Sequence, residues 1–224
     1  MKVRSWGGRK LAALAAVAGL ALAAAAFAAA KQPIRFTPAG QAAARAVVLQ
    51  RADLGSASGW TGGAKKPDLS SDTHCANFHP KDSDLVLIGA AETDWQHAGL
   101  EFDSEAQVLQ TPKMVQLDWQ RTVLSPHLLP CLRETLAKAG GASAAVVSVA
   151  RVPFPQVAPY TRAFRTVVEV TSGTQKVRVL IDVVLIGRGR TEVTLTTTAP
   201  LAAEAVVRPA ELRLARLLAS RLRS

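Results

Sequence analysis

The sequence predicts an α+β fold, with an antiparallel sheet of about five to seven strands, helices packed on one face and one disulfide. Three observations lead to this prediction. Four strand-like stretches fill the second half of the chain, and short glycine-bearing turns join the last three. Apolar residues at helical spacing stand before, between and after the strand-like regions. A single pair of cysteines, Cys75 and Cys131, predicts the disulfide.

The first 30 residues have the layout of a secretory signal peptide. A positive head, made by Lys2, Arg4, Arg9 and Lys10, precedes an unbroken apolar run over residues 11–30. Small residues end this run, so we expect cleavage near Ala28 or Ala30. The alternative is an uncleaved anchor, because about 20 helical residues can just cross a bilayer. No cysteine lies near the cleavage point, which argues against a lipoprotein. We expect a secreted or extracytoplasmic protein of the cell envelope.

The rest of the chain has the size of one domain. Residues 31–40, which include Pro33 and Pro38, predict an extended lead-in, and residues 41–224 predict a single monomeric domain. Four of the 27 basic residues belong to the signal, so residues 31–224 carry 23 basic and 17 acidic residues, a net charge of +6.

The positive charge is concentrated in the second half. Residues 119–224 hold 15 basic and 6 acidic residues. We expect a solvated, arginine-rich surface, and the alternative is contact with an anionic envelope component or polymer. No nucleic-acid partner is expected, because the arginines are scattered and aromatic residues are too sparse to form stacking platforms. Membrane contact is expected only through an uncleaved N-terminus.

Cys75 and Cys131 are expected to form a structural disulfide, since an even pair in an oxidising compartment most simply pairs with itself. The bridge would tie a long early loop to a helix in the middle of the chain. The chain-entropy estimate for closing such a loop is about 4 kcal/mol.

In the first half, the sequence predicts a mixture of helices, strands and one long loop. We expect a helix over residues 41–54, a surface loop over 55–82 and strands over 85–94, 100–102 and 107–117. Residues 119–139 predict a turn of helix, a break, and a helix that starts at Ser125-Pro126 and ends at Gly140-Gly141.

The second half predicts a β-meander and a final helix. We expect strands over residues 144–152, 165–171, 176–186 and 190–198. The strand over 176–186 is apolar on both faces, which favours a central place in the sheet. The last helix is expected to open at Pro209, because leucines recur at helical spacing after it.

Several short motifs resemble those of a known family. They are Ala-Asp-Leu at 52–54, Gly59-Trp60, the cysteine after the loop, Gly89-Ala90, a helix bearing the second cysteine, and Gly187-Arg188. In this order they resemble secreted actinobacterial sensor-type domains, which form the extracellular part of receptor serine/threonine kinases and also occur as stand-alone exported proteins. The resemblance implies an antiparallel sheet flanked by helices, with a cleft for an unidentified ligand. The chain departs from the kinase form in having one disulfide instead of two and no kinase domain.

Two clusters could carry metal or nucleophile chemistry, and neither is favoured. His74, Cys75 and His79 lie close together, but their spacing matches no standard zinc pattern and a disulfide removes the thiolate. His127 and Cys131 share a helix face, yet a disulfide-bonded sulfur cannot attack a substrate. Residues 55–59 superficially match a nucleophile elbow but place alanine where serine is required. We expect no metal, no cofactor and no catalytic residue.

Carboxylates and tryptophans provide the remaining candidates. Five acids stand near predicted strand ends, namely Glu92, Asp94, Glu101, Asp103 and Glu105. A glycosidase needs two carboxylates across a cleft, and the alternative is plain surface charge. Trp60, Trp95 and Trp119 are predicted core residues that could alternatively line a ligand pocket.

These observations favour a non-enzymatic, exported ligand-binding or sensor-like domain whose ligand the sequence does not identify. The alternatives are a carboxylate-dependent hydrolase acting on envelope material and a purely structural interaction protein. A cleft holding two carboxylates with perturbed pKa values would favour the hydrolase. An apolar cavity between sheet and helix would favour ligand binding, and a flat surface would favour the interaction protein.

Overall fold

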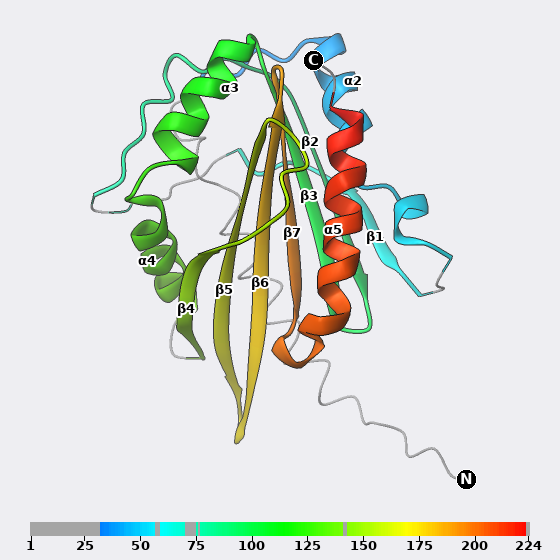
Figure 1. Ribbon diagram of the computed structural model, residues 1–224, viewed down its shortest axis with the longest axis vertical. Helices are drawn as coiled ribbons and strands as arrows, with labels where there is room; N and C mark the ends of the chain where they lie inside the picture. The colour runs from blue at the N-terminus through cyan, green and yellow to red at the C-terminus, as the bar shows by residue number, and fades with distance from the viewer. Residues whose placement is uncertain (1–31, 57–58, 70–74, 76, 141–142, 223–224) are drawn as a thin grey trace.

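A computed structural model describes residues 32–56, 59–69, 75, 77–140 and 143–222. Its centre is a seven-stranded sheet in which every neighbouring pair is antiparallel, in the order β1-β2-β3-β7-β6-β5-β4 (Figure 1). The strands are β1 (Thr61–Lys65), β2 (Leu87–His97), β3 (Leu100–Leu109), β4 (Ala144–Val152), β5 (Tyr160–Ser172), β6 (Gln175–Arg188) and β7 (Thr191–Pro200). The fold class predicted from the sequence is thereby confirmed.

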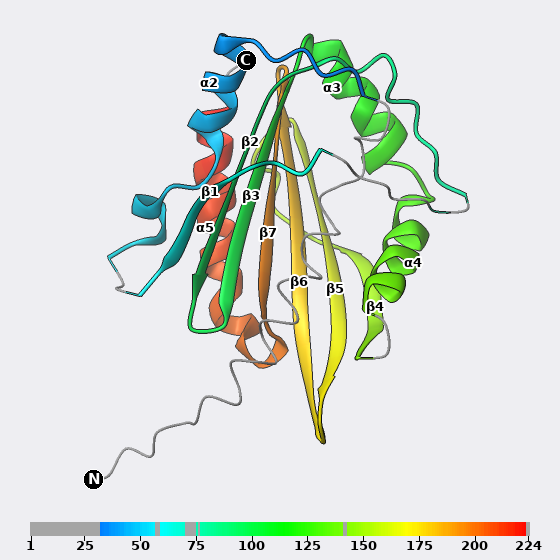
Figure 2. The same cartoon turned by 180° about the vertical axis from the view of Figure 1, so that it is seen from behind.

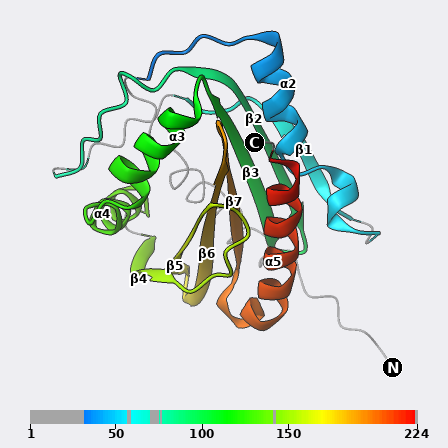
Figure 3. The ribbon, with the colours of Figure 1, turned by 45° about the horizontal axis from the view of Figure 1, so that its top comes forward.

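Helices cover both faces of this sheet, whereas the sequence predicted them on one. They are α2 (Pro38–Val47), α3 (Pro112–Asp118), α4 (Leu128–Gly140) and α5 (Glu204–Arg221), with a π-helix (Trp119–Val123) after α3. Figure 2, seen from behind, and Figure 3, seen from the top, place α2 and α5 on one side of the sheet and α3 and α4 on the other. Each pair of helices therefore buries its own face of the sheet.

The alternation of side chains along β3 explains why two cores form. Phe102, Ala106 and Val108 are buried in the core that includes Leu214 of α5. Leu109, pointing the opposite way, belongs to the core that contains Trp119 and Leu132. β6 lies between β7 and β5, as its two apolar faces predicted.

The disulfide between Cys75 and Cys131 is confirmed. The two Cα atoms are 5.3 Å apart and both residues are buried. Within α4, the Cys131 N–H donates to the carbonyl oxygen of His127, so the bridge ties the segment before β2 to the first turn of this helix.

The first helix begins earlier than predicted. Pro38, which the sequence placed in the extended lead-in, is the first residue of α2. Thr37 caps the helix by accepting a hydrogen bond from the Gly40 N–H at 3.0 Å. The helix ends at Val47, and a separate 3-10 turn, η1 (Arg51–Leu54), follows it.

Three other predictions need correction. The predicted loop over residues 55–82 contains β1. The predicted strand over 107–117 splits into the end of β3 and the helix α3, because Thr111-Pro112 forms a helix start. Finally, α5 starts at Glu204, so Pro209 lies inside the last helix instead of opening it.

The predicted signal peptide lies outside the described residues. Among the helices that the structure describes, none combines the length and apolar character needed to span a membrane.

Candidate functional site

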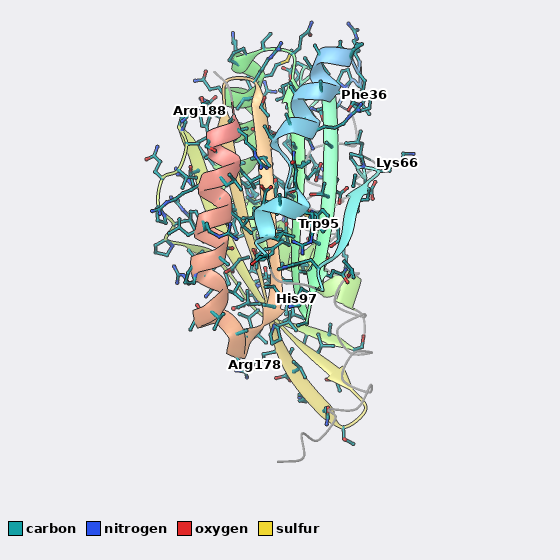
Figure 4. The ribbon with its side chains drawn as sticks, turned by 90° about the vertical axis from the view of Figure 1, so that its right-hand side faces the viewer. Phe36, Lys66, Trp95, His97, Arg178 and Arg188 are labelled. Carbon is teal, nitrogen blue, oxygen red and sulfur yellow. A yellow bond between two sulfur atoms is a disulfide. The ribbon has the colours of Figure 1, made fainter. Side chains whose placement is uncertain are left out.

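An open groove of about 760 Å³ runs beside β2 where that strand is left partly uncovered. Its walls come from the lead-in, α2, η1, β1 and the segment that follows β1. Figure 4 shows Phe36, Lys66 and Trp95, three of its lining residues, on one side of the molecule beside α2 and β1. The groove has the size of a small-molecule site.

Two elements that form walls of the groove, α2 and β1, pack closely against β2. A Cβ atom on Gly89 would lie 2.1 Å from the Gly40 carbonyl oxygen, and one on Gly40 would lie 2.2 Å from the Ile88 carbonyl oxygen. The backbone of α2 therefore rests directly on the backbone of β2. On the other wall, Gly62 of β1 has a φ of 124°, and a Cβ there would lie 2.0 Å from the Asp94 carbonyl oxygen.

A buried hydrogen-bond network fixes the chain that leaves α2. The Leu49 N–H donates to Ser104 Oγ at 2.8 Å, and Thr93 Oγ1 donates to the Leu49 carbonyl oxygen at 3.0 Å. Trp95 Nε1 donates to the same carbonyl oxygen at 3.4 Å. These bonds satisfy the backbone of Leu49 and hold it against the sheet.

The lining of the groove is largely apolar. The apolar side chains that line it are those of Phe36, Val48, Leu49, Ala64, Pro67, Leu69, Ala90, Ala91 and Trp95. A surface of this kind gains free energy when an apolar ligand displaces water from it.

Four basic residues complete the lining, against a single carboxylate. Lys65 binds that carboxylate: its Nζ is 2.8 Å from Glu92 Oε1 and 3.1 Å from Asp103 Oδ2. Burial alone would lower the pKa of Lys65, but the hydrogen bond to Glu92 and the charge of Asp103 outweigh burial and raise it. Arg45 and Lys66 form no ion pair with any residue that the structure describes. The groove is therefore apolar with a net positive charge.

The five carboxylates singled out from the sequence lie on one face of β2 and β3. Glu92 pairs with Glu105 across the two strands, and Asp94 pairs with Asp103. Strand alternation then brings Glu101 to the same face. Of these five, only Glu92 lines the groove.

Burial raises the pKa values of several of these acids. The pKa of Asp103 rises to about 8, because burial and the charge of Glu92 outweigh the attraction of Lys65. Burial, with the nearby charge of Asp94, raises the pKa of Glu101 to about 7. Burial also raises the pKa of Glu105 to about 7, although Gln107 Nε2 donates a hydrogen bond to it at 2.9 Å.

A second, smaller cavity of about 80 Å³ lies between the π-helix and the face of the sheet that carries Glu105. Three acids line it: Glu105, Asp118 and Glu192. The carboxyl groups of Asp118 and Glu192 interact with each other, and the Trp119 side chain interacts with Glu192. Apolar side chains of α4 and β6, such as Leu132 and Leu185, close the rest of the cavity, which has room for a few water-sized molecules.

Asp118 and Glu192 behave as a pair that shares a proton. Burial and the charge of Asp118 raise the pKa of Glu192 well above its ordinary value. Burial raises the pKa of Asp118 to about 6, against hydrogen bonds from Thr122 and Glu192 that lower it. Thr122 Oγ1 donates to Asp118 Oδ1 at 2.9 Å. Of the two acids, Glu192 is therefore the one whose protonated form is favoured more strongly.

Sequence reasoning did not single out this pair. Asp118 ends a helix that was predicted as a strand, and Glu192 is a lone acid in a threonine-rich strand. The structure places the pair beside a π-helix, and π-helices occur frequently at functional sites.

Two of the three predicted tryptophans line pockets. Trp95 lines the groove and Trp119 lines the enclosed cavity. Trp60 instead packs against His97 and Phe102, with ring centroids 5.2 and 5.7 Å away.

The remaining described residues singled out from the sequence do not line the groove or the cavity. His79 and His127 are exposed, and His74 lies outside the described residues. The disulfide occupies the sulfur atoms of Cys75 and Cys131. Residues 57–58 of the elbow-like segment 55–59 also lie outside the described residues. Across the described part of the chain, no group of three or more His, Cys, Asp or Glu side chains is arranged to hold a metal ion.

The sequence matches no protein-family model, and no curated protein matches it closely enough to be identified as a relative. The resemblance to sensor-type domains therefore stays a prediction.

Proposed function

We propose that this chain is an exported binding protein for a small anionic amphiphile, which occupies the groove beside β2. The observation that carries this proposal is the pairing of an apolar lining with two basic side chains, Arg45 and Lys66, that form no ion pair with the described residues. An apolar tail would cover Val48, Leu69 and Trp95, and an acidic head group would meet Arg45 and Lys66.

The internal balance of charge supports an anionic head group. Lys65 already binds Glu92, so the only lining carboxylate is neutralised. Arg45 and Lys66 are both exposed, and their charges gain most from a ligand that carries the opposite charge.

A carboxylate-dependent hydrolase has less support. Such an enzyme needs two carboxyl groups in a cleft that admits the substrate. Glu92 is the only acid among the described residues that line the groove, and the cavity that holds three acids has a volume of only about 80 Å³. A purely structural role would not need a concave site of this size.

Titration calorimetry of the exported protein with oleate, oleyl alcohol and oleyltrimethylammonium, which share one tail and differ in head-group charge, tests the proposal. We expect oleate to bind, oleyl alcohol to bind about tenfold more weakly, and the cationic amphiphile not to bind. Replacing both Arg45 and Lys66 by alanine should remove the preference for oleate over oleyl alcohol. The matched control is the double change Lys113→Ala and Arg133→Ala on α3 and α4, which removes the same charge outside the groove. Equal affinity for all three amphiphiles, or binding of none, would contradict the proposal.

A further inference from the structure

The lead-in to α2 presents apolar side chains to solvent in a fixed position. Ile34 is 48 % exposed and Phe36 is 44 % exposed. The other large exposed apolar side chains among the described residues are dispersed, at Leu124, Val147, Val177 and Val206. Single exposed apolar residues are normal on a protein surface, whereas a neighbouring pair indicates a contact surface.

Backbone hydrogen bonds to β2 hold this pair in place. The Leu87 N–H donates to the Pro33 carbonyl oxygen at 2.9 Å, and the Arg35 N–H donates to the Leu87 carbonyl oxygen at 2.8 Å. The Thr37 N–H then donates to the Ile88 carbonyl oxygen at 2.9 Å. Because side chains alternate along an extended segment, Ile34 and Phe36 share one side of it.

The surroundings of this pair are basic. Arg35, between the two apolar residues, is exposed, and the alternation places its side chain on the other side of the segment. Phe36 also lines the mouth of the groove together with Arg45 and Lys66. Apolar side chains flanked by basic ones fit the interface of an anionic bilayer, where the apolar groups enter the head-group region and the cations meet lipid phosphates.

The distribution of acids across the whole molecule strengthens this match. Seven acidic residues are buried in the part of the chain that the structure describes, whereas no lysine or arginine there is. The surface is therefore more positive than the net charge of residues 31–224 suggests. In the sequence, the lead-in also follows directly after the apolar segment 11–30, whose composition is that of a membrane-targeting segment.

From these observations we propose that the lead-in docks on an anionic bilayer, with Ile34 and Phe36 in the interface, and that the mouth of the groove receives its amphiphile from that bilayer. The inference rests on the proposed function for the identity of the cargo. The docking is tested at Ile34 and Arg35, which do not line the groove, so the two ideas can fail separately.

Flotation of the exported protein with phosphatidylcholine vesicles, with and without phosphatidylglycerol, tests the docking. We expect binding only to the anionic vesicles, and release at high salt. The double change Ile34→Ser and Arg35→Glu should weaken vesicle binding by about tenfold or more. Neither residue lines the groove, so oleate binding measured by calorimetry should be unchanged.

The matched control is Val177→Ser with Arg178→Glu, which makes the same two changes on the β5–β6 hairpin. Arg178 lies at the opposite end of the molecule from Phe36 (Figure 4). This control should bind anionic vesicles like the unaltered protein. Oleate binding without vesicle binding, or an equal loss in the control, would overturn the docking and leave the proposed function standing. Vesicle binding without oleate binding would overturn the proposed function and support the docking alone.

Discussion

The groove beside β2 and the cavity beneath the π-helix share one sheet but differ in size and charge. The groove has a volume of about 760 Å³, an apolar lining and basic side chains, and the one acid among its described lining residues is bound by Lys65. The cavity has a volume of about 80 Å³ and holds Asp118 and Glu192, whose pKa values burial raises. The proposed ligand is therefore assigned to the groove, whereas changes beside the cavity are expected to act on stability.

Removing the disulfide should lower the free energy of unfolding more than any other change, because it loosens the helix α4 beside the cavity. Cys131 belongs to α4, whose Leu128 and Leu132 line the cavity. Replacing both cysteines by serine should lower the free energy of unfolding by about 3 to 4 kcal/mol, measured by urea denaturation. Oleate affinity of the folded fraction should change little, because neither cysteine lines the groove. Loss of oleate binding at an unchanged unfolding midpoint would contradict the assignment of the ligand to the groove and of the stability effect to the cavity side.

The substitution Gly89→Val should instead disturb the packing of α2 beside the groove. The added Cβ would meet the Gly40 carbonyl oxygen at 2.1 Å, so α2 must move away from β2. We expect a loss of about 3 kcal/mol in the free energy of unfolding together with loss of oleate binding. Ala42→Val, on the exposed side of the same helix, is the control and should cost about 0.5 kcal/mol. Unchanged oleate binding in the Gly89 variant would place the ligand elsewhere.

The pH dependence of stability gives the smallest expected effect and concerns the buried acids. Burial raises the pKa of Glu105 from 4.5 to about 7 and that of Asp103 to about 8. Between about pH 4.5 and pH 8, the folded state therefore binds more protons than the unfolded chain. The free energy of unfolding should fall, on the order of 1 to 3 kcal/mol in total, as the pH rises from about 4.5 to 8.

A matched pair of variants sharpens this prediction. Glu192→Gln removes one acid whose pKa is raised, so the decline of stability with pH should become shallower. Glu169→Gln should leave the slope above pH 5 unchanged, because Lys176 lowers the pKa of Glu169. Urea denaturation at several pH values measures both slopes. Identical slopes in the two variants would show that Asp118 and Glu192 do not share a proton.

How much the sequence predicts depends on whether an element's own residues carry the signal. β5, β6 and β7 are correctly predicted because each strand carries its own apolar residues and short glycine-bearing turns join one strand to the next. β1 is missed because Thr61-Gly62-Gly63 has no apolar alternation, and its pairing with β2 makes it a strand. Thr111-Pro112 is the same kind of helix-start signal as Ser125-Pro126. The start of α3 could therefore have been predicted from the sequence.

The site follows the same rule. The five acids of β2 and β3 could be named from the sequence because they stand close together along the chain. Their common face, however, depends on the register of the two strands. Asp118 and Glu192 meet only through the topology, as do Arg45 and Lys66 across the groove. Trp95 was named as an alternative pocket residue, and the structure places it in the groove.

The strand order sets the moment at which the protein can finish folding. β3 has β2 on one side and β7 on the other, and Val108 of β3 pairs with Thr191 of β7, far later in the chain. A polypeptide that is threaded through a membrane from its N-terminus would deliver β2 and β3 long before their last neighbour emerges. The edge of β3 that pairs with β7 would stay unpaired until β7 emerges. The sheet could therefore be completed only when the final strand arrives.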